Sequence, residues 1–192
     1  RLGTMFGSEY YNLRPDIITI AKGLTSAYAP LSGSIFSNKV WKVLEQGTDE
    51  LGPIGHGWTY SAHPIGAAAG VANLELVDKM NLVSNAKEVG KYLLDELKNA
   101  FDSHPLVGEV RGDGMLASLE FLENKESLKF FDPAKKIGMQ VSSNLLKEGV
   151  IGRAMPHGDI LGLAPPLCLS RSEADIIVSS LKKSIDKVHS EI

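Results

Sequence analysis

The sequence of 192 residues contains little cysteine, few aromatic residues and almost no excess charge. Cys168 is the only cysteine, so an internal disulfide framework is excluded and a reducing compartment is favoured. The formal net charge is −3, and no arginine-rich run indicates binding to nucleic acid. No apolar stretch is long enough to cross a bilayer. We therefore expect a cytoplasmic protein of ordinary globular composition.

Glycine is plentiful by contrast, and together with proline it divides the first part of the sequence into short elements. A β-branched run predicts a buried strand at residues 17–20. Pro64 opens a helix with an almost bare glycine and alanine face. The other elements expected before residue 101 are a strand at 34–37, a short helix at 38–45, a loop at 47–57 and a helix at 82–100.

The pattern of elements changes from about Val107, and we place a domain boundary near residue 80, in or just after the long helical region. Ser170 and Glu173 form a capping box that predicts the start of the last helix. Short strands and packed helices are expected throughout this second part. These elements are strands at 107–110, 115–121, 150–151 and 160–163, and a helix at 134–148.

Lys22 directly follows the apolar run Ile17–Ile20 and precedes Gly23. Burial of such a strand end would lower the pKa of the lysine and free its neutral amine to act as a nucleophile. Lys22 is therefore a candidate for forming a Schiff base. The alternative is a lysine at a strand end whose ammonium group extends into solvent.

The second candidate is the segment 57–64, which combines glycine, hydroxyl groups and the start of a helix. Backbone N–H groups, the Thr59 hydroxyl and the helix dipole would together favour a phosphate group. The alternative is a plain helix entry that Ser61 or Thr59 caps, with Trp58 in the core. Both interpretations fit the spacing.

The histidines His56 and His63 and the single cysteine Cys168 have structural interpretations. His56 and His63 lie close together without a neighbouring carboxylate cluster, so we expect no metal site. His63 is expected to form a hydrogen bond near the start of the helix. Cys168 has no activating partner in the sequence and is expected to be a small core residue.

Arg153 is the third candidate, at the end of a predicted strand and beside Gly152. The guanidinium group can hold a carboxylate through two parallel hydrogen bonds. The alternative is a surface arginine that pairs with Asp159. The spacing favours neither interpretation.

Taken in order, these segments resemble the class III (omega) aminotransferases, which are pyridoxal-phosphate enzymes of fold type I. Residues 16–24, DIITIAKGL, resemble the segment with the cofactor lysine, and residues 56–64, HGWTYSAHP, resemble the phosphate-contact segment. Residues 1–3, RLG, resemble the R-x-G stretch upstream of the lysine. Residues 153–159 and 164–166 resemble the stretch with the arginine that binds the substrate carboxylate.

The resemblance implies a role for each candidate residue. Lys22 would form the Schiff base with pyridoxal 5'-phosphate and then move a proton between the substrate Cα and the cofactor C4′. Thr59 would bind the cofactor phosphate of the neighbouring subunit, which implies a homodimer with shared active sites. Arg153 resembles the mobile arginine that accepts the substrate carboxylate. The implied reaction moves an amino group between an amine or ω-amino acid and a keto acid such as pyruvate.

The resemblance also implies an α/β architecture. Residues 1–78 would form the end of the large cofactor-binding domain, and residues 79–192 the small α+β C-terminal domain. In the family, the aspartate on the pyridine nitrogen, the stacking aromatic residue and the glycine-serine phosphate loop lie upstream of Arg1. We therefore expect an incomplete fragment, the C-terminal half of the enzyme, which is inactive by itself.

Other functions share these motifs. A decarboxylase, racemase or aminomutase would use the same lysine chemistry. Arg153 favours transamination over these, because two different substrates must share one pocket. A catalytically inactive binding or assembly fragment is the alternative from a different class.

Overall fold

The computed structural model describes residues 1–192 and divides into two compact units. The C-terminal unit comprises Arg1–Phe6 and Leu82–Ile192, and the N-terminal unit comprises Gly7–Asn81. None of the helices is both long and apolar enough to span a membrane.

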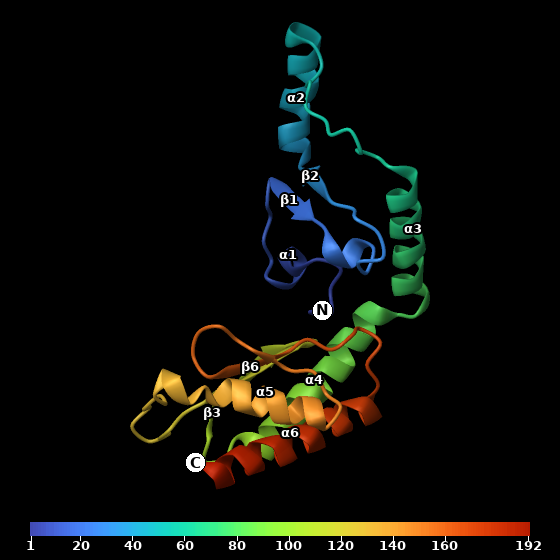
Figure 1. Cartoon of the computed structure of the whole chain (residues 1–192). Helices are drawn as coiled ribbons and strands as arrows, with labels where there is room; N and C mark the ends of the chain where they lie inside the picture. The colour runs from blue at the N-terminus through green and yellow to red at the C-terminus, as the bar shows by residue number, and fades with distance from the viewer. The chain divides into compact units, whose positions relative to one another are not determined.

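The C-terminal unit is a four-stranded antiparallel sheet in the order β3-β4-β6-β5, with helices against one face (Figure 1). The two long helices α4 and α6 pack against each other, and α5 packs against α6 and the sheet. The elements are β3 (Val107–Asp113), β4 (Leu116–Phe121), β5 (Arg153–Ala154), β6 (Ile160–Leu163), α4 (Leu82–Phe101), η2 (Pro133–Lys135), α5 (Ile137–Lys147) and α6 (Arg171–Glu191).

The core of this unit lies between the sheet and the three helices. Apolar residues three or four positions apart make one continuous buried stripe on α4. The predicted capping box opens α6, because Ser170 and Glu173 each satisfy the other's backbone N–H group. Ile176 lies outside the buried stripe of α6, since 55% of its surface is exposed.

Glycine allows the first residues of the chain to join this unit. A Cβ atom on Gly90 of α4 would overlap the backbone of Gly114, in the turn between β3 and β4. Gly114 itself adopts a left-handed conformation, with φ of 52°, directly against Arg1. The N–H group of Met115 then donates to the Arg1 carbonyl at 2.8 Å. Close backbone packing therefore joins α4, this turn and the segment Arg1–Phe6.

The N-terminal unit contains a two-stranded antiparallel sheet, with helical segments before, between and after its two strands (Figure 1). Ile17 of β1 pairs with Phe36 of β2. The elements are α1 (Gly7–Tyr10), β1 (Ile17–Ile20), η1 (Lys22–Leu24), β2 (Gly33–Phe36), α2 (Asn38–Leu51) and α3 (Pro64–Lys79).

The structure corrects several predicted element bounds. Helix α2 continues past Gly47 and stops at Gly52, whose φ of 83° is unfavourable for other residues. The strand predicted at 150–151 lies instead at Arg153–Ala154, where β6 offers a partner. The strand was misplaced because its position depends on pairing with β6, and the helix end was misplaced because Gly47 is tolerated inside α2.

Two burial predictions are also wrong for this chain. The strand Ile17–Ile20 was expected to be buried, but Ile17 is 52% exposed, because the strand pairs only with β2. Cys168 is exposed rather than part of the core. It follows the Pro165–Pro166 pair, in the connection between β6 and α6.

Candidate active site

Lys22 is the first residue of the 3₁₀ turn η1, directly after β1 and Ala21. Its side chain is exposed and has no hydrogen-bond or ion-pair partner. Its backbone is left-handed, with φ of 53°, which is uncommon for a residue other than glycine. A Cβ atom on the following Gly23 would meet no atom within 4 Å. The amine is therefore accessible, and the burial that the strand pattern predicted for it is absent in this chain.

The loop after Lys22 is anchored to helix α3 by Asn73. The Asn73 side-chain amide donates to the carbonyls of Gly23 at 2.9 Å and Leu24 at 3.2 Å. Its oxygen accepts a hydrogen bond from the Ser26 hydroxyl at 2.6 Å. Asn73 is not among the site residues predicted from the sequence. The available signal was one polar side chain on the bare glycine and alanine face of the predicted helix.

Thr59 lies in the turn that leads into α3, with its side chain exposed and without a hydrogen-bond partner. The turn is closed by Ser61, whose hydroxyl accepts from the Trp58 N–H group at 3.0 Å. Trp58 is 74% exposed in this chain, which does not fit the alternative interpretation of a plain helix entry with Trp58 in the core. The Thr59 hydroxyl is consequently free to contact a ligand.

His63, and neither Ser61 nor Thr59, caps helix α3. Its ring Nδ1 accepts from the Ile65 N–H group at 3.3 Å, which confirms the structural role expected for this histidine. No cluster of three or more histidine, cysteine or carboxylate side chains could hold a metal ion.

Arg153 lies at one end of a row of residues that crosses the sheet of the C-terminal unit. The register pairs Arg153 with Gly162, Gly162 with Ser118, and Ser118 with Arg111. Directly opposite residues of antiparallel strands share one face of a sheet. Buried neighbours such as Leu161 face the helices, so both arginines lie on the opposite face.

The two arginines differ in their partners. Arg111 donates hydrogen bonds to Glu109 and Glu120, each at 2.5 Å, and the bond to Glu120 is the main cause that raises the pKa of Arg111. Arg153 is exposed and forms no ion pair. Asp159, the alternative partner for Arg153, accepts instead from the Gly138 N–H group at 2.9 Å. Arg153 therefore keeps its guanidinium available for an external carboxylate.

Helix α5 holds both sides of the hairpin that carries Arg153. The Ser142 hydroxyl donates to the Gly152 carbonyl at 2.6 Å on one side, and Asp159 bonds to Gly138 on the other. Gly152 is buried so closely against α5 that a Cβ atom would lie 2.8 Å from Leu145. The hairpin is thus fixed at its base while Arg153 stays exposed.

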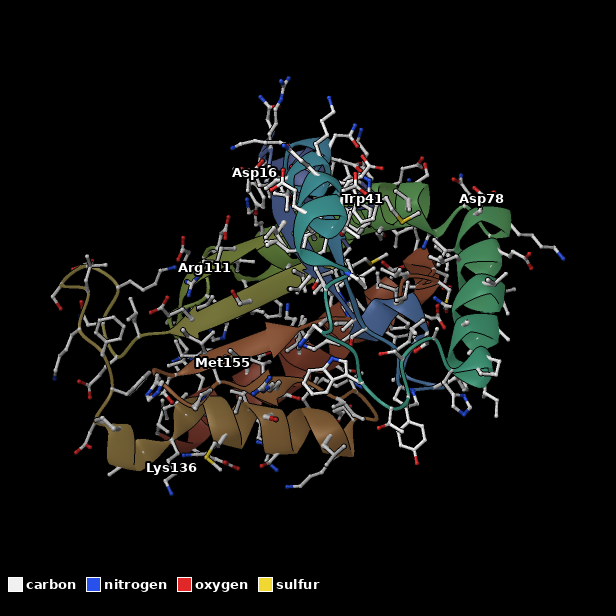
Figure 2. All side chains as sticks on the ribbon, turned by 90° about the horizontal axis from the view of Figure 1, so that it is seen from above. Asp16, Trp41, Asp78, Arg111, Lys136 and Met155 are labelled. Atoms are coloured by element: carbon white, nitrogen blue, oxygen red, sulfur yellow. The ribbon has the colours of Figure 1, made fainter.

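An open cavity of about 740 Å³ lies over this face of the sheet. Apolar and small residues make up most of its lining, with Arg111 and Arg153 as the charged members. Figure 2 shows Arg111 and Met155, which both line it. Because Arg111 is already neutralised by two glutamates, Arg153 is the group that would attract an anion here.

The structure places the three predicted site residues in two units. Lys22 and Thr59 belong to the N-terminal unit, where no hydrogen bond joins them, and Arg153 belongs to the C-terminal unit. Each of the three side chains is exposed and lacks a partner within the chain. The N-terminal unit thus offers a free primary amine and a free hydroxyl group, and the C-terminal unit offers a free guanidinium group.

Comparison with known proteins identifies the family of the chain. Residues 1–185 match the family Aminotransferase class-III. The chain is 55% identical to a diaminobutyrate–2-oxoglutarate transaminase of Halomonas elongata, over 98% of this chain and 40% of that protein. It is 38% identical to a putrescine–pyruvate aminotransferase of Pseudomonas aeruginosa, over 97% of this chain and 40% of that protein.

Solved structures show the same relationship. A transaminase from directed evolution by ancestral reconstruction superposes with a TM-score of 0.96 at 57% identity, over all of this chain and 42% of its own. An (S)-enantioselective omega-transaminase from Thermomicrobium roseum gives a TM-score of 0.89 at 37% identity, over 98% of this chain and 41% of its own.

The chain belongs to the class III aminotransferases, a family of enzymes that use pyridoxal phosphate. Its mixed α/β fold is part of the fold of the solved transaminases. The chain spans about 40% of the length of the curated relatives it matches.

Proposed function

We propose that the full-length protein is an aminotransferase that moves an amino group between an amine or ω-amino acid and a keto acid such as pyruvate. The observation that carries the proposal is the placement of Lys22. A solvent-accessible lysine without a partner follows β1 directly, on a left-handed turn that is anchored from α3. This turn lies within the family match.

Pyridoxal phosphate supplies the aldehyde that takes up amino groups and the ring that withdraws electrons from the substrate Cα. In the proposed function, the Lys22 amine would hold the cofactor by condensing with its aldehyde, with loss of water, and the free amine would later move a proton at the substrate Cα. The groups present fit this cofactor, because Lys22 offers a free primary amine and Thr59 a free hydroxyl group.

We further propose that Thr59 binds the phosphate held by the second subunit of a homodimer. Arg153 would bind the carboxylate of the keto acid and of amino-acid substrates. Its lack of an ion-pair partner supports this role, because a guanidinium already paired to a carboxylate would have to break that pair first. The N-terminal and C-terminal units would correspond to the end of the large domain and to the small domain.

The relatives' names suggest the class of substrate. One relative is named for diaminobutyrate and 2-oxoglutarate, and another for putrescine and pyruvate. Each pair joins a compound with two amino groups to a keto acid. We therefore propose a donor of this type for the full-length protein, and a keto-acid acceptor that Arg153 recognises by its carboxylate.

The test of the lysine assignment is chemical trapping. The full-length protein would be mixed with pyridoxal phosphate, reduced with borohydride and digested for mass spectrometry. A phosphopyridoxyl group on Lys22 is expected, while Lys39, an exposed lysine paired with Asp16, should stay unmodified. An absence of the adduct, or equal labelling of Lys22 and Lys39, would contradict the proposal.

A second assay separates transamination from the other activities of this chemistry. Formation of alanine from pyruvate should depend on an added amine donor. Release of carbon dioxide, or racemisation of the donor without alanine formation, would indicate a decarboxylase or a racemase instead. A full-length protein that traps the cofactor on Lys22 but turns over no donor would support the inactive alternative.

A further inference from the structure

The backbone after Lys22 contains several residues in an unfavourable conformation. Ser26 and Ala27 have φ values of 49° and 64°, in addition to the 53° of Lys22. Left-handed residues other than glycine are strained, so such a cluster persists only where surrounding contacts hold it. Thr25 supplies one contact from inside the loop, since it is buried and donates to the Ala29 carbonyl at 2.6 Å.

Helix α3 supplies the contacts from outside the loop. Gly66, Gly70 and Asn73 are spaced by four and three residues, which places them on one face of the helix. A Cβ atom on Gly66 would lie 3.1 Å from the Pro30 carbonyl, and one on Gly70 would lie 2.9 Å from Leu31. The two glycines thus let the loop approach the helix closely enough for the Asn73 side chain to reach it.

We propose that Asn73 is a positioning residue for Lys22. By binding the carbonyls of Gly23 and Leu24, Asn73 holds the Gly23–Leu24 and Leu24–Thr25 peptide units, which begin one residue after Lys22, and so stabilises the left-handed turn. The φ angle at Lys22 determines the direction in which the side chain leaves the backbone. Asn73 thereby sets the direction of the amine without touching it. This inference rests on the proposed function of Lys22.

Asn73 uses both ends of its side-chain amide in this arrangement. Its nitrogen donates twice, and its oxygen accepts once from Ser26. Aspartate has almost the same shape but no N–H group, so Asn73→Asp would place a carboxylate oxygen against two carbonyl oxygens. This substitution therefore tests the donor function specifically, and Asn73→Ala tests the whole side chain.

The first readout is hydrogen exchange of the full-length protein without cofactor. In Asn73→Ala and Asn73→Asp, the amides of residues 23–28 should exchange about five- to tenfold faster, as expected for the loss of one or two hydrogen bonds. Amides of α4 should keep their rates. Asn99→Ala and Asn99→Asp make the same chemical changes at an exposed helix position and should leave residues 23–28 unchanged.

The second readout is the rate at which borohydride-trapped phosphopyridoxyl groups accumulate on Lys22 at limiting pyridoxal phosphate. This rate should fall several-fold in both Asn73 variants and stay at the unaltered value in both Asn99 variants. Ser26→Ala removes only the third hydrogen bond from an exposed side chain, so it should give smaller changes in both readouts. If an Asn73 variant does not fold, Ser26→Ala serves as the test of the inference instead.

Unchanged amide exchange and unchanged trapping on Lys22 in the Asn73 variants would overturn the role of Asn73 but leave the proposed function standing. Where neither Asn73 variant folds, unchanged exchange and unchanged trapping in Ser26→Ala would overturn it equally. Absence of trapping in the unaltered protein would overturn the proposed function as well, so the two failures are distinguishable.

Discussion

Replacing Arg153 with alanine is expected to weaken the use of pyruvate far more than the use of an aldehyde acceptor of similar size. Arg153 is exposed over the open cavity and has no ion-pair partner in the chain. A carboxylate would therefore bind the guanidinium without displacing another group. An aldehyde acceptor offers no carboxylate, so its reaction should hardly depend on this side chain.

The size of the effect follows from the type of bond. Hydrogen bonds to charged groups contribute about 1.5 to 3 kcal/mol, which corresponds to a roughly ten- to 150-fold change in kcat/KM. The exposure of Arg153 favours the lower part of this range, because water screens the pair. We therefore expect a loss of roughly tenfold for pyruvate and a loss within about twofold for the aldehyde.

The assay compares kcat/KM for the two acceptors at one amine-donor concentration in the full-length protein. Arg111→Ala is the matched control, since Arg111 lies in the same row and lines the same cavity but is paired with two glutamates. Its ratio of the two kcat/KM values should equal that of the unaltered protein. Equal losses for both acceptors in Arg153→Ala, or the same discrimination in Arg111→Ala, would refute the reasoning.

Three further predictions concern cofactor binding, packing and pH. Thr59→Ala should raise the Kd for pyridoxal phosphate about tenfold in a fluorescence titration, through loss of a bond to a charged phosphate, and an unchanged Kd would defeat the phosphate role. Gly90→Ala should lower the free energy of unfolding in urea by about 1 to 3 kcal/mol, because overlap with the Gly114 backbone outweighs a gain in helix propensity of about 1 kcal/mol. A stabilised variant would contradict this packing. Burial lowers the pKa of His104, against the opposing hydrogen bond to Asp186, so its contribution to stability should be complete above about pH 7 and be lost as the pH falls below about 6.5. Urea midpoints should show that loss in the unaltered protein and a flatter profile in His104→Gln, and identical profiles would exclude the histidine as the cause.

The elements with local signals were predicted well. Pro64 and the capping box at Ser170 gave the starts of α3 and α6 correctly, because a helix start depends on a few neighbouring residues. The end of α2 was misplaced, because Gly47 is tolerated inside a helix and the stop depends on Gly52. The strand at Arg153 was shifted, because β5 exists only through its pairing with β6.

For the candidate site too, some features were predictable from the sequence and others only from the structure. The residue types and order of Lys22, Thr59 and Arg153 predicted the family without any coordinates, and the family match confirms that prediction. The partners of these residues could not be predicted. Asn73 is fifty residues from Gly23, so only the packing of α3 brings the two together.

The sequence by itself determined which chemical groups this protein offers and the family to which it belongs, because both depend on residue identity and order along the chain. Only the tertiary structure decided how those groups are held. It assigned Asp159 to helix α5 rather than to Arg153, it placed Asn73 behind the Lys22 loop, and it left Cys168 exposed. Such contacts join residues that are distant in the sequence, so their energies depend on packing that no local pattern records.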